Sequence, residues 1–371
     1  MKIGIDARCL MQKNYSGVSW YAFNLLENIF RLDQTNEYVL FYNSSKEVRV
    51  PEFSQKNVRY ASFHFPNKLF NFSLNFFDQP KLDKLIGGVE VFFTPNLHFV
   101  SWSKDCKKVL TVHDLSFLRF PNFFTWKSRL WHKLILWKKL LQEADILIAD
   151  SQSTKNDLMD LFKIKEEKIK MVHLGVGGEF KVMSPNSPEL QKTRDKYKLP
   201  EEFIFFIGTI EPRKNIEGLI KAYQTMATDC HLVIGGGGGW KNRDTYRLAK
   251  NNNKIHFIGY VDEKDKPALY NLAEVLLYPS FYEGFGLPIA ESMACGCPVV
   301  AGNNSSQAEV LGEAGMIVNP HDINEIKTAT ELILNDVPLR QKLIERGLER
   351  VKKFSWVKTA QKTLDILSSL K

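Results

Sequence analysis

Short apolar runs alternate along the chain with longer segments whose apolar residues recur at a helical period. Such runs, rich in Val, Ile, Leu and Phe, are typical of strands buried on both faces of a parallel sheet. The first group of predicted strands is 2–6, 38–42, 89–93, 109–112 and 146–149, with a short strand near 168–172. The second group is 203–207, 232–235, 255–259, 275–278 and 298–300. The alternation predicts an α/β protein with two doubly wound parallel sheets.

A polar, proline-bearing stretch that ends at Pro200 separates the two groups of strands. We place the hinge between two domains there, so residues 1–178 form the first domain and residues 179–353 the second. A last amphipathic helix is predicted from Phe354 to Leu370. A length of 371 residues is sufficient for two domains of ordinary size.

Composition narrows the class of protein. With 44% hydrophobic and 25% charged residues, the chain resembles an ordinary soluble globular protein. The 5 cysteines are scattered without zinc spacing, which favours a reducing compartment over a disulfide framework. The N-terminus reads directly as a strand, and no apolar run reaches the roughly 18 residues of a spanning helix. We therefore expect a cytoplasmic protein that is not integral to a membrane.

The net charge of +8 is concentrated in one segment. Residues 101–140 hold nine Lys or Arg and two acids, a difference of +7, together with four tryptophans. Lysine beside tryptophan favours the headgroup layer of an anionic membrane, which suggests a peripheral location on the inner face. The alternatives are a helix over 125–142 with its aromatic side chains in the core and its lysines in water, and a nucleic-acid surface. The tryptophans are Trp102, Trp126, Trp131 and Trp137.

The stretch 278–300 carries the most specific chemistry. Glu283 lies in a turn between an apolar strand and a helix, and Gly284 and Gly286 allow the backbone to approach a ligand closely. The amides at the start of such a helix attract phosphate. Glu291 lies about two turns into the helix and suits ribose or sugar hydroxyls. The alternative is that both glutamates are solvated, but the apolar neighbours of Glu283 argue against it because a buried charge needs a partner.

The sequence Glu283-Gly-Phe-Gly-Leu-Pro-Ile-Ala-Glu291 resembles the two-glutamate motif of the retaining nucleotide-sugar glycosyltransferases of family 4, which have the GT-B fold. The resemblance implies two facing Rossmann-like domains with a cleft between them. The first binds the acceptor and the second binds the donor. It also implies that the last helix packs back on the first domain, and that neither a metal nor a cofactor is required.

Arg213 and Lys214 are expected at the carboxyl end of the strand 203–207, close to Gly208. Arginine grips phosphate with a planar fork and lysine supplies a point charge, so the pair can stabilise a departing nucleoside diphosphate. Two adjacent basic residues can also be a solvated surface, but the pair matches the phosphate-binding residues of the family.

The other residues expected to bind the donor are inferred from the resemblance to the family. Tyr260 and Val261 match a loop that meets the base, and the glycine run 235–239 is either a close passage for the nucleotide or a flexible loop. Gly17 matches a glycine-rich loop near the donor phosphates, although Ser16 replaces a second glycine; the alternative is a left-handed loop glycine. The expected donor-binding residues are Gly17, Gly208, Arg213, Lys214, Tyr260, Val261, Glu283, Gly284, Phe285, Gly286, Leu287 and Glu291.

His113 follows the strand 109–112, where the family has a histidine that lines the sugar site, and Asp114 is expected to fix its tautomer. The expected catalytic residues are thus His113, Arg213, Lys214 and Glu283, with no metal ligands.

These patterns and the resemblance together predict a metal-independent glycosyltransferase that moves a sugar to a glycan or lipid-linked glycan. The first choice of donor is GDP-mannose, which would supply mannose, and the second choice is a UDP-sugar. Bacterial surface-polysaccharide mannosyltransferases have similar stretches. The rivals are a nucleotide-sugar-binding regulator without transfer activity, a dinucleotide oxidoreductase, and a nucleic-acid-binding protein. The oxidoreductase is disfavoured because neither half has a Gly-x-Gly-x-x-Gly turn after its first strand.

Overall fold

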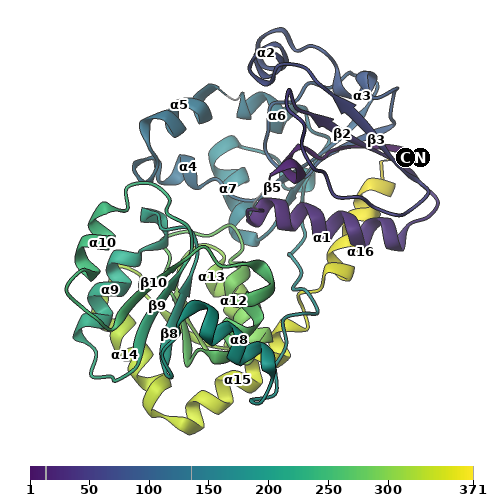
Figure 1. The fold of residues 1–371 in the computed structure, drawn as a ribbon. Coiled ribbons are helices and arrows are strands. Elements are labelled where there is room, and N and C mark those ends of the chain that lie inside the picture. The colour runs from purple at the N-terminus through teal and green to yellow at the C-terminus, as the bar shows by residue number, and fades with distance from the viewer. Residues whose placement is uncertain (13–14, 135, 371) are drawn as a thin grey trace. The chain divides into compact units, whose positions relative to one another are not determined.

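The computed structural model describes residues 1–12, 15–134 and 136–370, without the side chain of Trp131. The chain divides into two compact units (Figure 1). Unit 1 comprises Met1–Leu115, Trp126–Gly175 and Trp356–Lys371. Unit 2 comprises Ser116–Thr125 and Val176–Ser355.

Unit 1 is built on a parallel sheet of 7 strands in the order β3-β2-β1-β4-β5-β6-β7. The strands Val91–Thr94 and Ile146–Ala149 are buried along their whole length, as is typical of a parallel sheet covered by helices on both faces. The strands are β1 (Lys2–Asp6), β2 (Glu37–Asn43), β3 (Val58–Phe63), β4 (Val91–Thr94), β5 (Lys107–Val112), β6 (Ile146–Ala149) and β7 (Ile169–Met171).

The helices of unit 1 include the last helix of the chain, α16, which packs against α1. They are η1 (Arg8–Met11), α1 (Gly17–Leu32), α2 (Asn67–Phe72), η2 (Ser73–Phe77), α3 (Leu82–Leu85), α5 (Trp126–Leu134), α6 (Trp137–Glu143), α7 (Gln152–Phe162), η4 (Glu166–Lys168) and α16 (Trp356–Ser368).

Unit 2 is built on a parallel sheet of 6 strands in the order β10-β9-β8-β11-β12-β13. The strands are β8 (Phe203–Ile207), β9 (His231–Gly235), β10 (Ile255–Gly259), β11 (Val275–Tyr278), β12 (Val299–Gly302) and β13 (Met316–Val318). Helices α9, α10 and α14 pack together on one face, and α8, α11 and α12 pack together on the other (Figure 1).

The helices of unit 2 begin with two short ones that precede α5 in the sequence. They are α4 (Ser116–Arg119), η3 (Pro121–Phe123), α8 (Pro188–Tyr197), η5 (Pro212–Lys214), α9 (Ile216–Thr225), α10 (Arg243–Ala249), η6 (Glu263–Asp265), α11 (Lys266–Leu272), α12 (Leu287–Ala294), α13 (Gln307–Leu311), α14 (Ile323–Asn335) and α15 (Val337–Val351).

The fold class is confirmed: two parallel α/β sheets are present. Three details differ from what the sequence indicated. One alternative for the basic segment was a single helix over 125–142, but the described residues form α5 and α6, with Leu136 between them outside any helix. Residues 116–125 were expected in the first domain, but they cluster with unit 2. The division after Gly175 lies three residues before the expected boundary at 178.

Among the described residues, no helix combines the length and the apolar character that a membrane span requires.

Candidate active site

Three residues expected to bind the donor come together in unit 2. Arg213 and Lys214 lie in η5, directly after β8, and Glu283 lies in the turn after β11. Strands β8 and β11 are neighbours although they are not consecutive in sequence, so the chain order reverses between them. Ligands of open α/β sheets bind at this topological switch point, at the carboxyl ends of the strands.

The carboxylate of Glu283 bridges the two cations. Its Oε1 accepts from Lys214 Nζ at 2.7 Å and its Oε2 accepts from Arg213 Nη1 at 3.0 Å. Lys214 Nζ also donates to the Tyr278 hydroxyl at 2.6 Å, and Arg213 forms a second ion pair with Glu211 at 2.8 Å. The two cations and two carboxylates balance one another, which makes their burial tolerable.

Burial and the neighbouring charges shift the pKa values of this cluster in opposite directions. Burial alone would raise the pKa of Glu283, but Lys214 and Arg213 outweigh it and lower the pKa to about 2. Burial lowers the pKa of Lys214, and the carboxylate of Glu283 opposes that effect. Glu283 is therefore an anion at neutral pH, held by a buried ammonium group and a guanidinium group.

The turn that carries Glu283 is fixed by the loop after β12. The backbone amide of Glu283 donates to Ser305 Oγ at 2.9 Å. The Ser306 hydroxyl donates to the carbonyl oxygens of Glu283 and Phe285 at 2.9 and 2.8 Å. Gln307 is fully buried, and its side-chain amide donates to Ser280 O at 2.8 Å. The turn is thus held in one conformation before any ligand arrives.

Gly286 makes the sharp turn into α12 possible. Its φ of 97° is in the left-handed region that side chains rarely adopt, and it is the residue before the first turn of the helix. Gly284 and Phe285 are buried in the same turn, and Leu287 begins the helix.

Glu291 lies in α12 and is 5% exposed. Its Oε2 accepts from the Tyr270 hydroxyl at 2.7 Å, and its Oε1 lies 3.9 Å from Lys266 Nζ. Burial would lower the pKa of Lys266, but Glu291 and Glu263 outweigh it and raise the pKa. The carboxylate is therefore preorganised by a hydroxyl and a cation from α11.

The glycine run 235–239 packs against the backbone of the loop after β8. The amide of Ile210 donates to Gly237 O at 3.0 Å, and a Cβ on Gly236 would collide with the carbonyl oxygen of Gly208. Close contact between two loops therefore explains glycine at position 236. Farther along the edge of the sheet, Tyr260 is half exposed and Val261 is buried.

In unit 1, His113 lies at the carboxyl end of β5, as expected, but its partner differs from the prediction. His113 Nδ1 lies 2.5 Å from Asp150 Oδ2, so Asp150 rather than Asp114 orients the ring. The reason is strand register: Val112 pairs with Ala149, which places the next residue of each strand side by side. Burial lowers the pKa of His113, but Asp150 outweighs it and raises the pKa.

Gly17 is the first residue of α1 and its φ is not positive, so the alternative of a left-handed loop glycine is wrong. The loops that follow β1 and β4 are linked to each other through Arg8. Its guanidinium pairs with Asp6, and its Nη2 donates to the carbonyl oxygen of Phe99 at 2.7 Å. Gly17 and His113 belong to unit 1, whereas the other expected site residues belong to unit 2.

Sequence reasoning missed the residues that hold the site residues in place. Glu211, Tyr278, Ser306 and Asp150 were not among the expected residues. The signal for Asp150 was available, because it directly follows β6, just as His113 directly follows β5.

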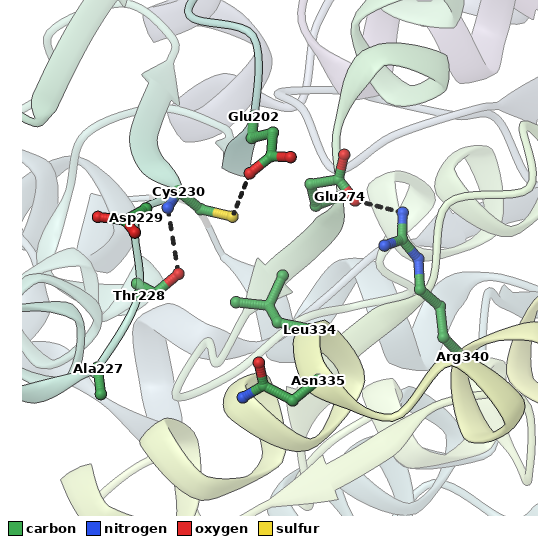
Figure 2. A pocket seen from close by; sticks show the side chains of 9 residues that line it. All are labelled: Glu202, Ala227, Thr228, Asp229, Cys230, Glu274, Leu334, Asn335 and Arg340. Carbon is green, nitrogen blue, oxygen red and sulfur yellow. Dashed lines mark hydrogen bonds and ion pairs between the residues drawn. The ribbon is translucent and has the colours of Figure 1, made fainter.

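A cavity of about 400 Å³ lies elsewhere in unit 2 (Figure 2). Glu202, Cys230 and Glu274 line it and directly precede β8, β9 and β11, so it opens at the amino ends of the strands. Glu274 is paired there with Arg340. This cavity is distinct from the cluster around Glu283. In the part of the chain that the structure describes, no group of three or more His, Cys, Asp or Glu residues could hold a metal ion.

Two family models match consecutive parts of the chain. The model "Glycosyltransferase Family 4" matches residues 15–178, and "Glycosyl transferases group 1" matches residues 189–350. The O-antigen chain mannosyltransferase B of Escherichia coli is 29% identical over 94% of this chain and 95% of its own length. The serotype-specific mannosyltransferase WbdA of E. coli is 32% identical over 70% of this chain, a match that covers 33% of WbdA.

Solved structures with the same fold cover the whole chain. Sucrose-phosphate synthase of Thermosynechococcus elongatus has a TM-score of 0.77 at 20% identity and covers 100% of this chain and 98% of its own. WaaG, a glycosyltransferase of lipopolysaccharide biosynthesis, has a TM-score of 0.71 at 15% identity, with 99% of each chain covered. The fold, the motif after β11 and both family models agree: this chain is a glycosyltransferase of group 1, family 4, with the GT-B fold.

Proposed function

We propose that the enzyme transfers mannose from GDP-mannose, with retention at the anomeric carbon and without a metal, to a hydroxyl of a glycan or lipid-linked glycan in surface-polysaccharide synthesis. The observation that carries this proposal is the buried cluster of Arg213, Lys214 and Glu283 at the switch point of the unit 2 sheet. Mannose is chosen because the relatives of greatest coverage and identity given above are named mannosyltransferases.

The cluster suits the departure of a nucleoside diphosphate. An ammonium group has three N–H donors. Among the described residues Lys214 contacts Tyr278 and Glu283, so a third donor remains for a phosphate oxygen. Negative charge grows on the leaving diphosphate, and preorganised cations stabilise it most when water is excluded. Glu283, fixed between the cations, can accept hydrogen bonds from hydroxyls of the transferred sugar.

Glu291 and His113 complete the proposed assignment. Glu291 accepts hydrogen bonds from the ribose hydroxyls, because a buried carboxylate needs donors and Tyr270 supplies only one of them directly. We assign His113, whose ring Asp150 holds, to the reacting face of the sugar. No protein nucleophile is needed in this scheme.

The test is to incubate the enzyme with GDP-mannose, UDP-glucose or UDP-galactose, each with a lipid-linked glycan acceptor, in buffer with EDTA. We expect a mass increase of one hexose with GDP-mannose and no loss of rate with EDTA. Transfer from a UDP-sugar instead would replace the donor assignment. Binding of nucleotide with no product from any donor would favour the alternative, a nucleotide-sugar-binding regulator with the same fold.

We also propose that unit 1 contacts an anionic membrane surface, where a lipid-linked acceptor would be presented. On α5, the side chains of Trp126, Leu130 and Leu134 are 65%, 50% and 45% exposed. They recur every four residues and thus share one face of the helix. The adjacent side chains of Lys127, Arg129 and Lys133 are exposed.

A second group of exposed apolar side chains lies close to α5. Leu69 and Phe72 of α2 and Phe76 and Phe77 of η2 are between 50% and 68% exposed. The two groups are adjacent because Asn75 Nδ2 donates to the carbonyl oxygen of Leu134 at 2.9 Å. Apolar side chains flanked by cations suit the headgroup layer of anionic lipid. The alternative of a helix with its aromatic side chains in the core fits Trp137, which is buried, but not Trp126.

A further inference from the structure

Residues 116–125 follow β5 of unit 1 in the sequence, yet they belong to unit 2. They comprise α4, Phe120, η3 and the two residues Phe124 and Thr125. A segment that leaves the sheet it follows must gain contacts that compensate for the conformational entropy of ordering it. The 116–125 segment makes contacts with two loops of unit 2.

The first contacts are with the turn that carries Glu283. The ring of Phe123 stacks on Phe281, with centroids 5.5 Å apart and an interplanar angle of 19°. The ring of Phe120 lies 5.7 Å from that of Tyr282. Phe281 and Tyr282 directly precede Glu283. The 116–125 segment therefore packs on the two residues that lead into the proposed sugar-binding carboxylate.

The second contacts are with the end of the glycine run. Trp240 Nε1 donates to the carbonyl oxygen of Phe123 at 2.6 Å, and the Trp240 ring stacks on Phe124 at 5.8 Å. Lys241 Nζ donates to the carbonyl oxygen of Asn122 at 2.6 Å. The segment is thus fastened to the loop after β9 by a ring contact and two hydrogen bonds to its backbone.

These two loops flank the loop that carries the phosphate-binding pair. In the sheet order, β9 lies on one side of β8 and β11 lies on the other. The loop after β8 is joined to the Glu283 turn, since the amide of Phe281 donates to Arg213 O and Arg213 Nη1 donates to Tyr282 O, both at 2.9 Å. A shift of Phe281 or Tyr282 would therefore move the partners of Arg213.

We propose that Phe120 and Phe123 of the 116–125 segment act as positioning residues for Arg213 and Glu283 in the donor site of unit 2. They do not touch the donor in this scheme. They hold the Trp240 loop and the Glu283 turn at the spacing that a diphosphate requires. This inference rests on the proposed role of Arg213 and Glu283 in donor binding.

The effect is expected in donor affinity rather than in folding. The ring contacts add to hydrogen bonds with the hydroxyl groups of Ser305 and Ser306 that already fix the turn, so removal of one ring leaves the turn folded. Coupling between two sites in a protein typically changes affinity by about 5- to 150-fold. We expect a change near the lower end, because the loops keep their other contacts.

The experiment compares three variants of the full-length enzyme with two controls. Phe123→Leu removes the ring but keeps apolar volume, Phe123→Tyr keeps the ring, and Trp240→Phe removes the indole N–H while it keeps a smaller aromatic ring. The controls are the wild type and Leu118→Ala, since the Leu118 side chain is 40% exposed in the same segment. The dissociation constants of GDP and UDP are measured by titration calorimetry, with Tm and the KM and kcat for the donor.

We expect Phe123→Leu and Trp240→Phe to weaken binding of the preferred nucleotide by about 5- to 10-fold and to raise the KM for the donor. Phe123→Tyr and Leu118→Ala should bind as the wild type does, and Tm should stay within a few degrees in all. Wild-type affinity in Phe123→Leu and Trp240→Phe would overturn the inference but leave the proposed function intact. A wild-type enzyme that binds neither nucleotide would overturn both.

Discussion

Lys214 Nζ and Glu283 Oε1 form an ion pair of 2.7 Å in which both side chains are less than one-tenth exposed. The two residues are 69 positions apart and follow two strands that neighbour each other in the sheet. A buried pair of this kind contributes little net stability relative to apolar residues, but removing one partner leaves a buried unpaired charge. Its presence at the switch point therefore indicates a functional requirement.

Removal of Arg213 tests the phosphate-binding role. We expect Arg213→Ala to reduce kcat/KM by about 10²-fold or more, by analogy with the loss of single electrostatic contacts in other enzymes. Arg213→Lys should recover part of the rate, since it restores the charge but not the planar fork. Steady-state transfer assays measure both. Near-normal turnover in Arg213→Ala would contradict the assignment.

The ion pair also predicts a pH dependence of stability. The folded pKa of Glu283 is about 2, below its ordinary value of 4.5. The carboxylate therefore stabilises the folded state fully above pH 4.5, and this contribution is lost as the pH falls from 4.5 toward 2. At pH 7 we expect the free energy of unfolding of Glu283→Gln to be about 3–5 kcal/mol lower than that of the wild type, because Lys214 is left buried without its anion.

Urea unfolding at pH 7 and at pH 3.5 measures this dependence. The difference between the wild type and Glu283→Gln should be smaller at the lower pH. Glu325→Gln is the matched control, because Glu325 accepts one hydrogen bond at an exposed helix start and should show a small difference at both values. Equal differences for Glu283→Gln at the two pH values would show that its charge does not stabilise the fold.

Much of the fold was predictable because most strands are buried on both faces and appear in the sequence as uninterrupted apolar runs. Strand β3 was missed because it is an edge strand in which only Val58 is fully buried, so its sequence alternates irregularly. Strand β13 was missed because it has only 3 residues. The 116–125 segment was assigned to the wrong unit, since nothing local in a phenylalanine-rich stretch specifies which sheet it packs on.

The site was predictable where its residues are adjacent in sequence. Arg213 with Lys214, and Glu283 with its glycines, are local patterns whose chemistry is visible at once. The partners of these residues depend on register and on strand order, which local patterns do not specify. Asp150 rather than Asp114 holds His113 because β5 and β6 pair in a particular register.

The His113–Asp150 pair predicts a measurable titration. Asp150 raises the pKa of His113 above its ordinary value of 6.5. The pairing of the protonated His113 with Asp150 therefore stabilises the fold fully below pH 6.5, and this stabilisation is lost as the pH rises through the pKa of His113 in the folded state. In NMR spectra, His113 should titrate above 6.5 in the wild type. Asp150→Asn should lower that midpoint, whereas Asp114→Asn should lower it less, since Asp114 contributes less. An equal or larger effect of Asp114→Asn would contradict this ranking.

Glu291 should distinguish nucleotides by their ribose. If its carboxylate accepts from the ribose hydroxyls, the wild type will bind GDP about tenfold more tightly than 2′,3′-dideoxy-GDP, the equivalent of roughly 1.4 kcal/mol. Glu291→Gln should lose most of this preference. Tyr270→Phe, which removes one donor to Glu291, should retain it. Titration calorimetry with both nucleotides provides the measurement, and an unchanged preference in Glu291→Gln would exclude the assigned role.

The exposed apolar side chains of unit 1 predict binding to anionic vesicles. We expect the wild type to sediment with vesicles of phosphatidylglycerol and phosphatidylcholine but not with phosphatidylcholine alone. The bound fraction should fall with added salt, because the charges of Lys127, Arg129 and Lys133 are screened. Replacing Trp126 with Ser, or Phe76 and Phe77 together with Ser, should reduce binding without lowering Tm, since all three side chains are more than half exposed.

The matched control is Val337→Ser, which removes an apolar side chain that is 71% exposed in unit 2. Because it lies outside the group formed by α2, η2 and α5, it should bind vesicles as the wild type does. If Val337→Ser and Trp126→Ser lowered binding equally, the loss would reflect general hydrophobicity and not a membrane-binding surface. If none of the variants changed binding and salt abolished it, charge alone would account for the association, and the apolar side chains would need another partner.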